Sequence, residues 1–364
     1  METCPLIFNP IFRPKVWGGR RLADLLGKNL PGTDAIGESW ECADLTGGVS
    51  VVACGPAIGQ TLHQLVTDWG PDLLGRTKTV DGRFPLLIKF LDAAQPLSIQ
   101  VHPSDEAAAK MGLAHATKHE AWFVIHAEPG ATIYRGLRPG VSLAQLRECL
   151  ERAPRDVPSL LNQIPVKAGN QFYVPGGTVH ALGAGVVVAE VQTPSDTTFR
   201  LYDWERTRPT DDAGLHIEKS LACVDSTIDI ASFERRSHVS SIFTTVTRLV
   251  TCPSFIIEQV RFVEQIEQDI PYAEMVCWIV LEGRGEVIHG AGQREAFQRG
   301  DVVVLPAGLK KGRLKTLTPC TWLEVTVPTP SDLSGFRRPE LDALQSSTPS
   351  GDSFVPLRVE AKEG

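Results

Sequence analysis

Residues Pro96–Pro103 read PLSIQVHP and place Gln100 and His102 two positions apart in a segment typical of a β-strand. Successive side chains of a strand alternate between its faces, so this spacing offers an amide oxygen and an imidazole nitrogen to one cation. The remaining donors have to come from elsewhere in the chain. The candidates are Glu120 in KHEAWFV and His180 in VPGGTVHALG, each on or beside a predicted strand. The sequence therefore predicts a four-ligand metal site built on β-strands.

Strand signals are many and helical signals are brief, which indicates a mainly β fold with short helical insertions. Runs of strand-like composition, repeatedly bounded by Gly, Pro and Asp, suit an antiparallel jelly-roll barrel. They are Phe84–Leu91, Ser98–Val101, Ala121–Ile125, Gln171–Val174, Val186–Val191 and Thr198–Tyr202. Two segments, Thr61–Leu74 and Ser142–Arg152, have apolar residues at helical spacing and are predicted to be packing helices.

A second group of strand-like runs follows toward the C-terminus, and its phrases GRGEVIH and FQRGDVVVLPAG echo the earlier AGNQFYVPGG. A weak internal repeat, and hence a second barrel, accounts for this similarity. Only His289 is available as a histidine donor among these strands, so we expect this barrel to hold no metal. The predicted organisation is a metal-binding catalytic domain at 1–235, a degenerate domain at 236–328 and a mobile tail at 329–364, rich in Pro, Ser, Gly and Asp. The second group consists of Phe255–Phe262, Met275–Leu281, Gly285–His289, Val302–Leu305 and Thr321–Val327.

Composition narrows the class of protein. The 364 residues carry a formal net charge of −7 and no Lys/Arg-rich block, which argues against nucleic acid as a partner. No apolar run is long enough to cross a bilayer and the N-terminus lacks the pattern of a signal peptide, so no membrane association and a cytoplasmic location are expected. The 8 cysteines are dispersed without a C-x-x-C pair, which favours reduced thiols.

A longer set of phrases resembles one branch of the cupin superfamily, the type I mannose-6-phosphate isomerases in their short form. In chain order they are NPIFRPKVWGG, IGESWECAD, FPLLIKFLDAAQPLSIQVHPSDEAA, KHEAWFVI, GNQFYVPGGTVHALGAGVVVAEVQ and SDTTFRLYDWER. They cover most of residues 9–206. The resemblance implies two cupin-type barrels and an aldose–ketose isomerase that interconverts mannose 6-phosphate and fructose 6-phosphate through an enediol. It also implies one zinc ion per chain, bound by Gln100, His102, Glu120 and His180.

The same resemblance marks Arg200 in SDTTFRLYD as catalytic. A guanidinium does not readily lose its proton, so Arg200 is expected to orient substrate or stabilise developing charge. Glu190 and Asp196 are the further catalytic candidates, since either carboxylate can move a proton or hold Arg200. The base that removes the carbon-bound proton stays open among Glu190, Asp196, a zinc-bound hydroxide and His119.

For the sugar phosphate, the cationic candidates are Lys89 and Lys118, both in phrases that resemble the family. Lys118 precedes Glu120 by two residues, so an extended backbone puts both on one face. Lys89 interrupts the apolar run PLLIKFL, where an unpaired ammonium would be costly, so it should meet an anion or reach solvent. Trp17, Glu38 and Glu41 are interpreted as pocket lining or support. The phrase AHATKHEA departs from the more usual Gly-Lys-Thr-Glu, which makes the phosphate contacts less secure than the metal contacts.

Two rival functions fit the same phrases. One is a metal-dependent cupin oxygenase, which needs redox-active iron and usually more histidine ligands than are present here. The other is a non-catalytic protein that binds sugar phosphates without converting them. A kinase or dehydrogenase is excluded because neither the G-x-x-x-x-G-K-[ST] motif nor a dinucleotide-binding glycine pattern occurs. Nothing in the sequence decides between a monomer and a dimer.

Overall fold

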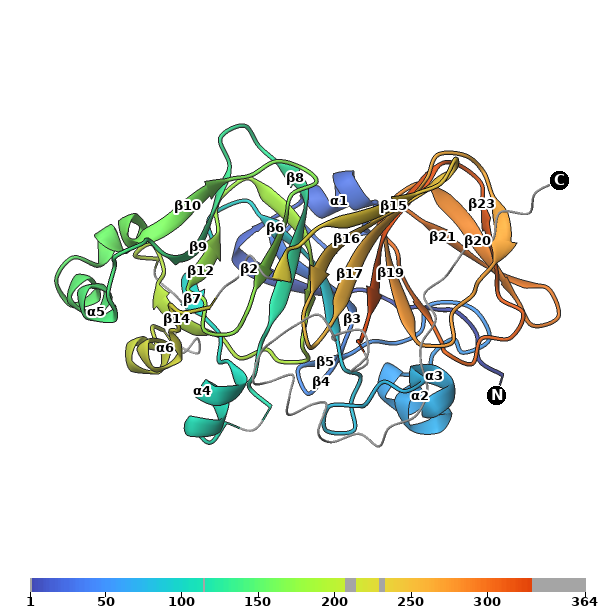
Figure 1. The fold of residues 1–364 in the computed structure, drawn as a ribbon, viewed down its shortest axis with the longest axis horizontal. Coiled ribbons are helices and arrows are strands. Elements are labelled where there is room, and N and C mark those ends of the chain that lie inside the picture. Colours follow the sequence, from blue (N-terminus) through green and yellow to red (C-terminus); the bar gives the residue numbers. More distant parts are fainter. Residues whose placement is uncertain (1, 114, 207–213, 229–232, 329–364) are drawn as a thin grey trace.

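The computed structural model describes residues 2–113, 115–206, 214–228 and 233–328, which form two antiparallel β-barrels side by side (Figure 1). Four main sheets follow one another along the long axis of the molecule, and the short helices lie mostly outside them. The expected mainly β architecture of two jelly-roll barrels with short helices is confirmed. The tail predicted at 329–364 lies outside the described residues.

The first barrel is closed by a six-stranded sheet and a five-stranded sheet. The six-stranded sheet has the order β11-β8-β13-β6-β3-β2, and the five-stranded sheet the order β10-β9-β12-β7-β14. Every pairing in both sheets is antiparallel. The strands are β2 (Ile11–Gly19), β3 (Ile36–Cys42), β6 (Leu87–Ala93), β7 (Ile99–Val101), β8 (Glu120–Ala127), β9 (Thr132–Leu137), β10 (Leu161–Pro165), β11 (Gln171–Val174), β12 (His180–Leu182), β13 (Val186–Gln192) and β14 (Phe199–Tyr202).

The second barrel combines a seven-stranded sheet, β1-β22-β19-β24-β17-β16-β15, with a four-stranded sheet, β18-β23-β20-β21. Strand pairing crosses the boundary expected at residue 235, because β1 near the N-terminus is hydrogen-bonded to β22. The strands are β1 (Leu6–Ile7), β15 (Ser237–Ser240), β16 (Thr244–Thr251), β17 (Ile256–Phe262), β18 (Glu267–Asp269), β19 (Val276–Glu282), β20 (Arg284–His289), β21 (Gln293–Gln298), β22 (Val302–Leu305), β23 (Arg313–Thr316) and β24 (Cys320–Thr326).

The helices are short, and the two expected from the sequence both occur. The helix α5 (Leu143–Arg152) begins after Ser142, whose side chain forms a capping box with Gln145. The helix expected over 61–74 is broken in two, because Gly70 adopts a left-handed φ of 47° and Pro71 starts a new turn. The remaining elements are α1 (Arg21–Leu26), α2 (Leu62–Trp69), α3 (Pro71–Leu74), α4 (Asp105–Lys110), α6 (Ile217–Cys223), a 3₁₀ helix at Pro154–Leu160 and the small pair β4 (Asp44–Leu45) and β5 (Gly48–Val49).

The largest hydrophobic core lies between the two barrels. Phe90, Phe123 and Val187 from the outer face of the six-stranded sheet share one buried cluster with Ile279 and Leu323 of the seven-stranded sheet. Because its other face lines the first barrel, β13 is buried at all seven positions. Its two polar residues therefore point inward, as strand alternation requires.

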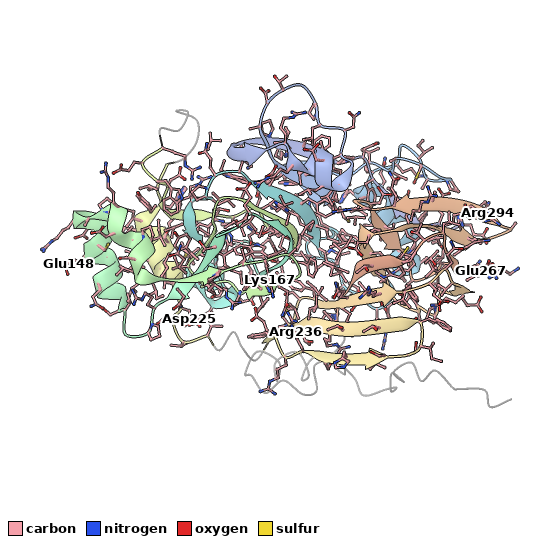
Figure 2. The ribbon with its side chains drawn as sticks, turned by 90° about the horizontal axis from the view of Figure 1, so that it is seen from above. Glu148, Lys167, Asp225, Arg236, Glu267 and Arg294 are labelled. Carbon is pink, nitrogen blue, oxygen red and sulfur yellow. The ribbon has the colours of Figure 1, made fainter. Side chains whose placement is uncertain are left out.

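The molecule is elongated, with one barrel at each end. In the perpendicular view of Figure 2, Glu148 on α5 lies at the first-barrel end, and Arg294 on β21 lies at the second-barrel end. The helices α4, α5 and α6 cover the outer face of the five-stranded sheet through a separate cluster that includes Leu146 and Leu221. No helix among the described residues is both long enough and apolar enough to span a membrane.

Candidate metal centre and active site

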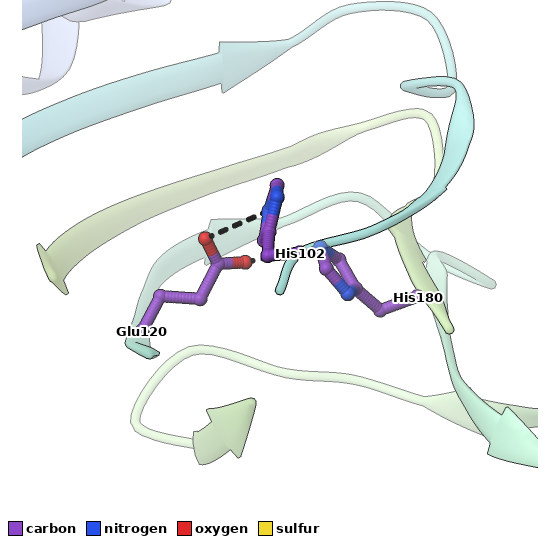
Figure 3. Close-up of side chains that lie close together, drawn as sticks. All are labelled: His102, Glu120 and His180. Carbon is purple, nitrogen blue, oxygen red and sulfur yellow. Dashed lines mark ion pairs between the residues drawn. The ribbon is translucent and has the colours of Figure 1, made fainter. Parts of the chain in front are cut away.

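Three side chains that are far apart in the sequence meet inside the first barrel: His102, Glu120 and His180 (Figure 3). His102 directly follows β7, Glu120 begins β8 and His180 begins β12, so both sheets contribute. The Nε2 atoms of His102 and His180 lie 3.3 Å and 3.1 Å from the two carboxylate oxygens of Glu120. All three residues are at most 1% exposed, and one donor atom from each lies within 4.8 Å of the others.

Backbone carbonyls fix the orientation of both imidazoles. His102 Nδ1 lies 2.9 Å from the carbonyl oxygen of Thr197, and His180 Nδ1 lies 2.8 Å from that of Thr178. A carbonyl only accepts, so each Nδ1 carries a proton and donates it, which leaves each Nε2 turned toward Glu120 and available as an acceptor. Ligating histidines in metalloproteins are held in this way.

The protonation states also suit a metal. Burial, together with the charge of Lys118, lowers the pKa of His102 to about 3. Burial alone would raise the pKa of Glu120, but Lys118 and the two imidazoles hold it well below its usual range. Glu120 Oε2 forms an ion pair with Lys118 Nζ at 3.0 Å, and both carboxylate oxygens face the two imidazoles. Two imidazoles and a carboxylate that converge in one buried space form a donor set that fits a divalent cation.

Gln100 lies beside this cluster. It is paired across the sheet with His180, and its Nε2 lies 3.4 Å from His180 Nε2. Its Oε1 accepts a hydrogen bond from Ser98 at 3.3 Å. The amide is therefore adjacent to the three donors, and a half-turn about its last side-chain bond exchanges the nitrogen for the oxygen.

Lys118 enters the same buried space. Its side chain is 5% exposed, and its Nζ lies 3.0 Å from both Glu120 Oε2 and His102 Nε2. The structure thus places Lys118 and Glu120 on one side of the chain, as their spacing predicts.

Lys89 lies between two carboxylates on the inner face of the six-stranded sheet. Its Nζ is 3.5 Å from Glu190 and 3.8 Å from Glu38, and the ring of Trp40 lies 5.3 Å away. Burial by itself would lower the pKa of Lys89, but the two carboxylates raise it above its ordinary value. The anions that this buried lysine contacts therefore belong to the protein itself.

Glu190 occupies the middle of the same row, opposite Lys89 on one side and Trp122 on the other. The indole of Trp122 donates to Glu190 Oε1 at 3.1 Å. Burial, and next the negative charge of Glu120, raise the pKa of Glu190 to about 7. A carboxyl group with this pKa can both accept and return a proton near neutral pH.

Arg200 completes a second row, on the five-stranded sheet. It is paired with Gln100, and Gln100 is paired with His180, so the three side chains share the inner face. Arg200 is partly exposed, which suits the mouth of a pocket. Asp196 is exposed in the loop between β13 and β14, close enough for its charge to raise the pKa of Lys89.

Of the two remaining predicted residues, Trp17 lies inside the first barrel and Glu41 does not. Trp17 is 7% exposed and packs in the inner core of the first barrel with Trp122. Glu41 lies on the opposite face of β3 from Glu38, because odd and even positions of a strand alternate. There it forms a buried ion pair with Lys28 at 2.7 Å and accepts a hydrogen bond from Ser39 at 2.5 Å. The structure therefore does not bring Glu41 to the site.

Sequence reasoning missed two inward-facing residues. Trp122 follows Glu120 by two positions, so strand alternation was a sufficient signal for it. Arg135 is paired with His180, stacks over Phe172 and donates to the carbonyl oxygen of Tyr173. Its segment, TIYRGL, has no feature that distinguishes an inner arginine from a surface one.

Comparisons with known proteins point to one family. The family model for the phosphomannose isomerase type I catalytic domain matches residues 6–132. The mannose-6-phosphate isomerase ManA of Bacillus subtilis is 36% identical over 331 residues, covering 88% of this chain and 98% of that protein. The mannose-6-phosphate isomerase of Streptococcus mutans is 37% identical over 317 residues, covering 84% of this chain and 93% of that protein.

A solved structure gives the same result for the fold. The crystal structure of the mannose 6-phosphate isomerase from Bacillus subtilis superposes with a TM-score of 0.80 at 29% identity, covering 89% of this chain and 100% of that one. Sequence similarity over nearly the full length, a shared fold and a buried His-Glu-His cluster lead to one assignment. The chain belongs to the type I mannose-6-phosphate isomerase family.

Proposed function

We propose that this protein is a zinc-dependent isomerase that interconverts mannose 6-phosphate and fructose 6-phosphate. The observation that carries the proposal is the buried His102–Glu120–His180 cluster, whose donor atoms converge beside Glu190, a carboxyl group with a pKa of about 7. Relatives that match most of the chain have this activity in their names.

The metal ligands in this proposal are Gln100, His102, Glu120 and His180, which bind one ion per chain. Nitrogen and oxygen donors of this mixture suit zinc, and a single carboxylate leaves the bound ion with net positive charge. When bound, the ion supplies Lewis-acid stabilisation of negative charge on the sugar oxygens.

Glu190 is the base that we assign to the proton transfer. Aldose-to-ketose conversion moves a proton from C2 to C1 through an enediol, while the hydroxyl proton of O2 passes to O1. A single carboxylate can take the carbon-bound proton and return it to the neighbouring carbon. His119 does not suit this role, since its Nδ1 accepts from Gly176 and its Nε2 faces Asp105. Asp196, exposed in its loop, is assigned to support of the cationic groups.

The three cationic side chains are assigned to charge stabilisation, substrate binding and support of Glu190. Arg200 stays charged and stabilises the oxygen charge that develops in the transition state. Lys118 is the residue that we assign to substrate anions, because it lies beside the metal ligands. Lys89 is held by Glu190 and Glu38, so its part is to stabilise the charged form of Glu190. Trp17 lines the barrel.

The test is a coupled assay for fructose 6-phosphate formed from mannose 6-phosphate, run on the purified protein, after chelation and after zinc is restored. Activity lost on chelation and regained with zinc is expected. Arg200→Ala should lower kcat by about 10²- to 10³-fold, and Arg200→Lys separates the need for charge from the need for a guanidinium. Zinc-loaded protein that binds the sugar phosphate without converting it would overturn the proposal in favour of a binding protein.

A further inference from the structure

The three segments that carry the metal donors meet at one residue that is not a donor itself. We propose that His119 is a positioning residue that fixes the relative placement of His102, Glu120 and His180. This inference rests on the proposed metal centre. It concerns how the chain holds that centre rather than which residues bind the ion.

The first contact joins His119 to the turn before His180. The backbone N–H of Gly176 donates to His119 Nδ1 at 3.0 Å. Two residues later in the same turn, Thr178 supplies the carbonyl that orients the His180 ring. The turn has no room to shift inward, since a Cβ on Gly176 would lie 2.4 Å from the carbonyl oxygen of Pro103. The His119 ring therefore holds the turn that sets the His180 orientation.

The second contact joins His119 to the segment after His102. Since Nδ1 accepts from Gly176, the proton of the neutral ring is on Nε2, and it points toward Asp105 Oδ2 at 3.5 Å. This hydrogen bond is the main cause that lowers the pKa of Asp105. Asp105 is the first residue of α4, three positions after His102, and Ser104 caps that helix. The ring thus bridges two donor segments while its own backbone continues into the third.

Backbone hydrogen bonds close the same triangle. The N–H of Lys118 donates to the carbonyl of Pro103 at 3.0 Å, and the N–H of Gly177 donates to that of His102 at 2.8 Å. The N–H of His119 donates to Thr193 Oγ1 at 3.1 Å. These bonds set the backbone, and the His119 ring adds a side-chain link between the three donor segments that does not use a donor atom. Loss of the ring would leave the donors present but less well aligned, which weakens metal binding more than it weakens the fold.

The experiment measures affinity for Zn²⁺ and Co²⁺ by competition with a chelator, together with the visible absorption of the Co²⁺ protein. His119→Ala should bind both metals about 10- to 100-fold more weakly and show an altered Co²⁺ spectrum. His119→Asn keeps an acceptor at the position of Nδ1 and should restore most of the affinity, whereas His119→Gln, which reaches only toward Asp105, should restore less. His238→Ala, at an exposed site on β15, is the matched control and should bind like the unaltered protein.

Thermal unfolding of each metal-free variant shows whether the fold is kept. If His119→Ala fails to fold, the comparison of the Asn and Gln variants decides the question. Affinities within about twofold of the unaltered protein, with an unchanged spectrum, would overturn the positioning role while leaving the proposed isomerase intact. Failure of the unaltered protein to bind either metal would instead overturn the metal centre, and the positioning role with it.

Discussion

Glu41 was expected from the sequence to line or support the substrate pocket, but in the structure it forms an ion pair with Lys28. These two roles predict different effects of substitution. Glu41 is 3% exposed, and its carboxylate accepts hydrogen bonds from Lys28 Nζ at 2.7 Å and from the Ser39 hydroxyl at 2.5 Å. The ammonium of Lys28 lies 5.2 Å from the Phe90 ring, on the side of the sheet that packs toward the second barrel. Glu41→Gln should therefore leave substrate binding unchanged and destabilise the fold.

The magnitude follows from what the substitution leaves behind. Removing one partner of a buried ion pair costs about 3–5 kcal/mol, because the other charge remains buried and uncompensated. The side chain of Lys28 is 9% exposed, so water does not replace the lost carboxylate fully. Burial raises the pKa of Glu41 in spite of Lys28, which places the expected loss at the lower end, about 3 kcal/mol. The double variant Lys28→Met, Glu41→Gln should recover most of this loss, because no unpaired charge remains.

Urea unfolding gives the change in stability, and the coupled assay gives KM for mannose 6-phosphate. A single Glu41→Gln variant with reduced unfolding free energy and unchanged KM fits the reasoning, as does recovery in the double variant. An increased KM with unchanged stability would refute it and return Glu41 to the substrate pocket. A double variant as unstable as the single one would show that the ion pair is not the cause.

Three further predictions concern the second barrel and the metal. Burial raises the pKa of Glu324 to about 7, so the folded state binds this proton more tightly than the unfolded state does. The contribution of this proton to stability is complete below about pH 4.5 and falls as the pH rises through 7. Urea titrations should show a loss of about 2–3 kcal/mol in unfolding free energy between pH 5 and pH 8, and Glu324→Gln should abolish this pH dependence. Zinc at 100 times its dissociation constant should add about 2.7 kcal/mol to the unfolding free energy, and equal melting temperatures with and without zinc would contradict this. Trp278→Ala in the interior of the second barrel, where the ring stacks 4.7 Å from Trp322, should cost about 3–5 kcal/mol without changing zinc affinity, and a parallel loss of zinc affinity would show that the barrels are coupled.

The sequence anticipated the parts of this molecule that depend on local pattern. Strand alternation places Lys118 with Glu120, and Ser142 marks the start of α5. The jelly-roll architecture followed from many short apolar runs bounded by turn residues. Each of these features is decided within a few residues of the chain, where period and capping chemistry act.

The features that escaped prediction are decided by contacts distant in sequence. A charged residue in a buried strand, such as Glu41, is expected to face a pocket. The second barrel, however, covers the outer face of β3, so this face is as buried as the inner one. Lys89 was expected to find an anion, and which anions it contacts depends on the register of β6 with its neighbours β3 and β13. The inward orientation of Arg135 likewise depends on the pairing of β9 with β12, which sets it opposite His180. The hydrophobic pattern of a single segment does not specify which strands pair with it or in which register.

The pairing of β1 with β22 has a consequence for synthesis of the chain. Leu6 is paired with Val304, so its partner strand is synthesised 298 residues later (304 minus 6). At about 5–20 residues per second, the interval is roughly 15–60 s. Throughout that time the N-terminal segment has no partner strand of its own sheet. Completion of the seven-stranded sheet is therefore a late event, and deletion of residues 2–8 should slow refolding of the second barrel more than refolding of the first.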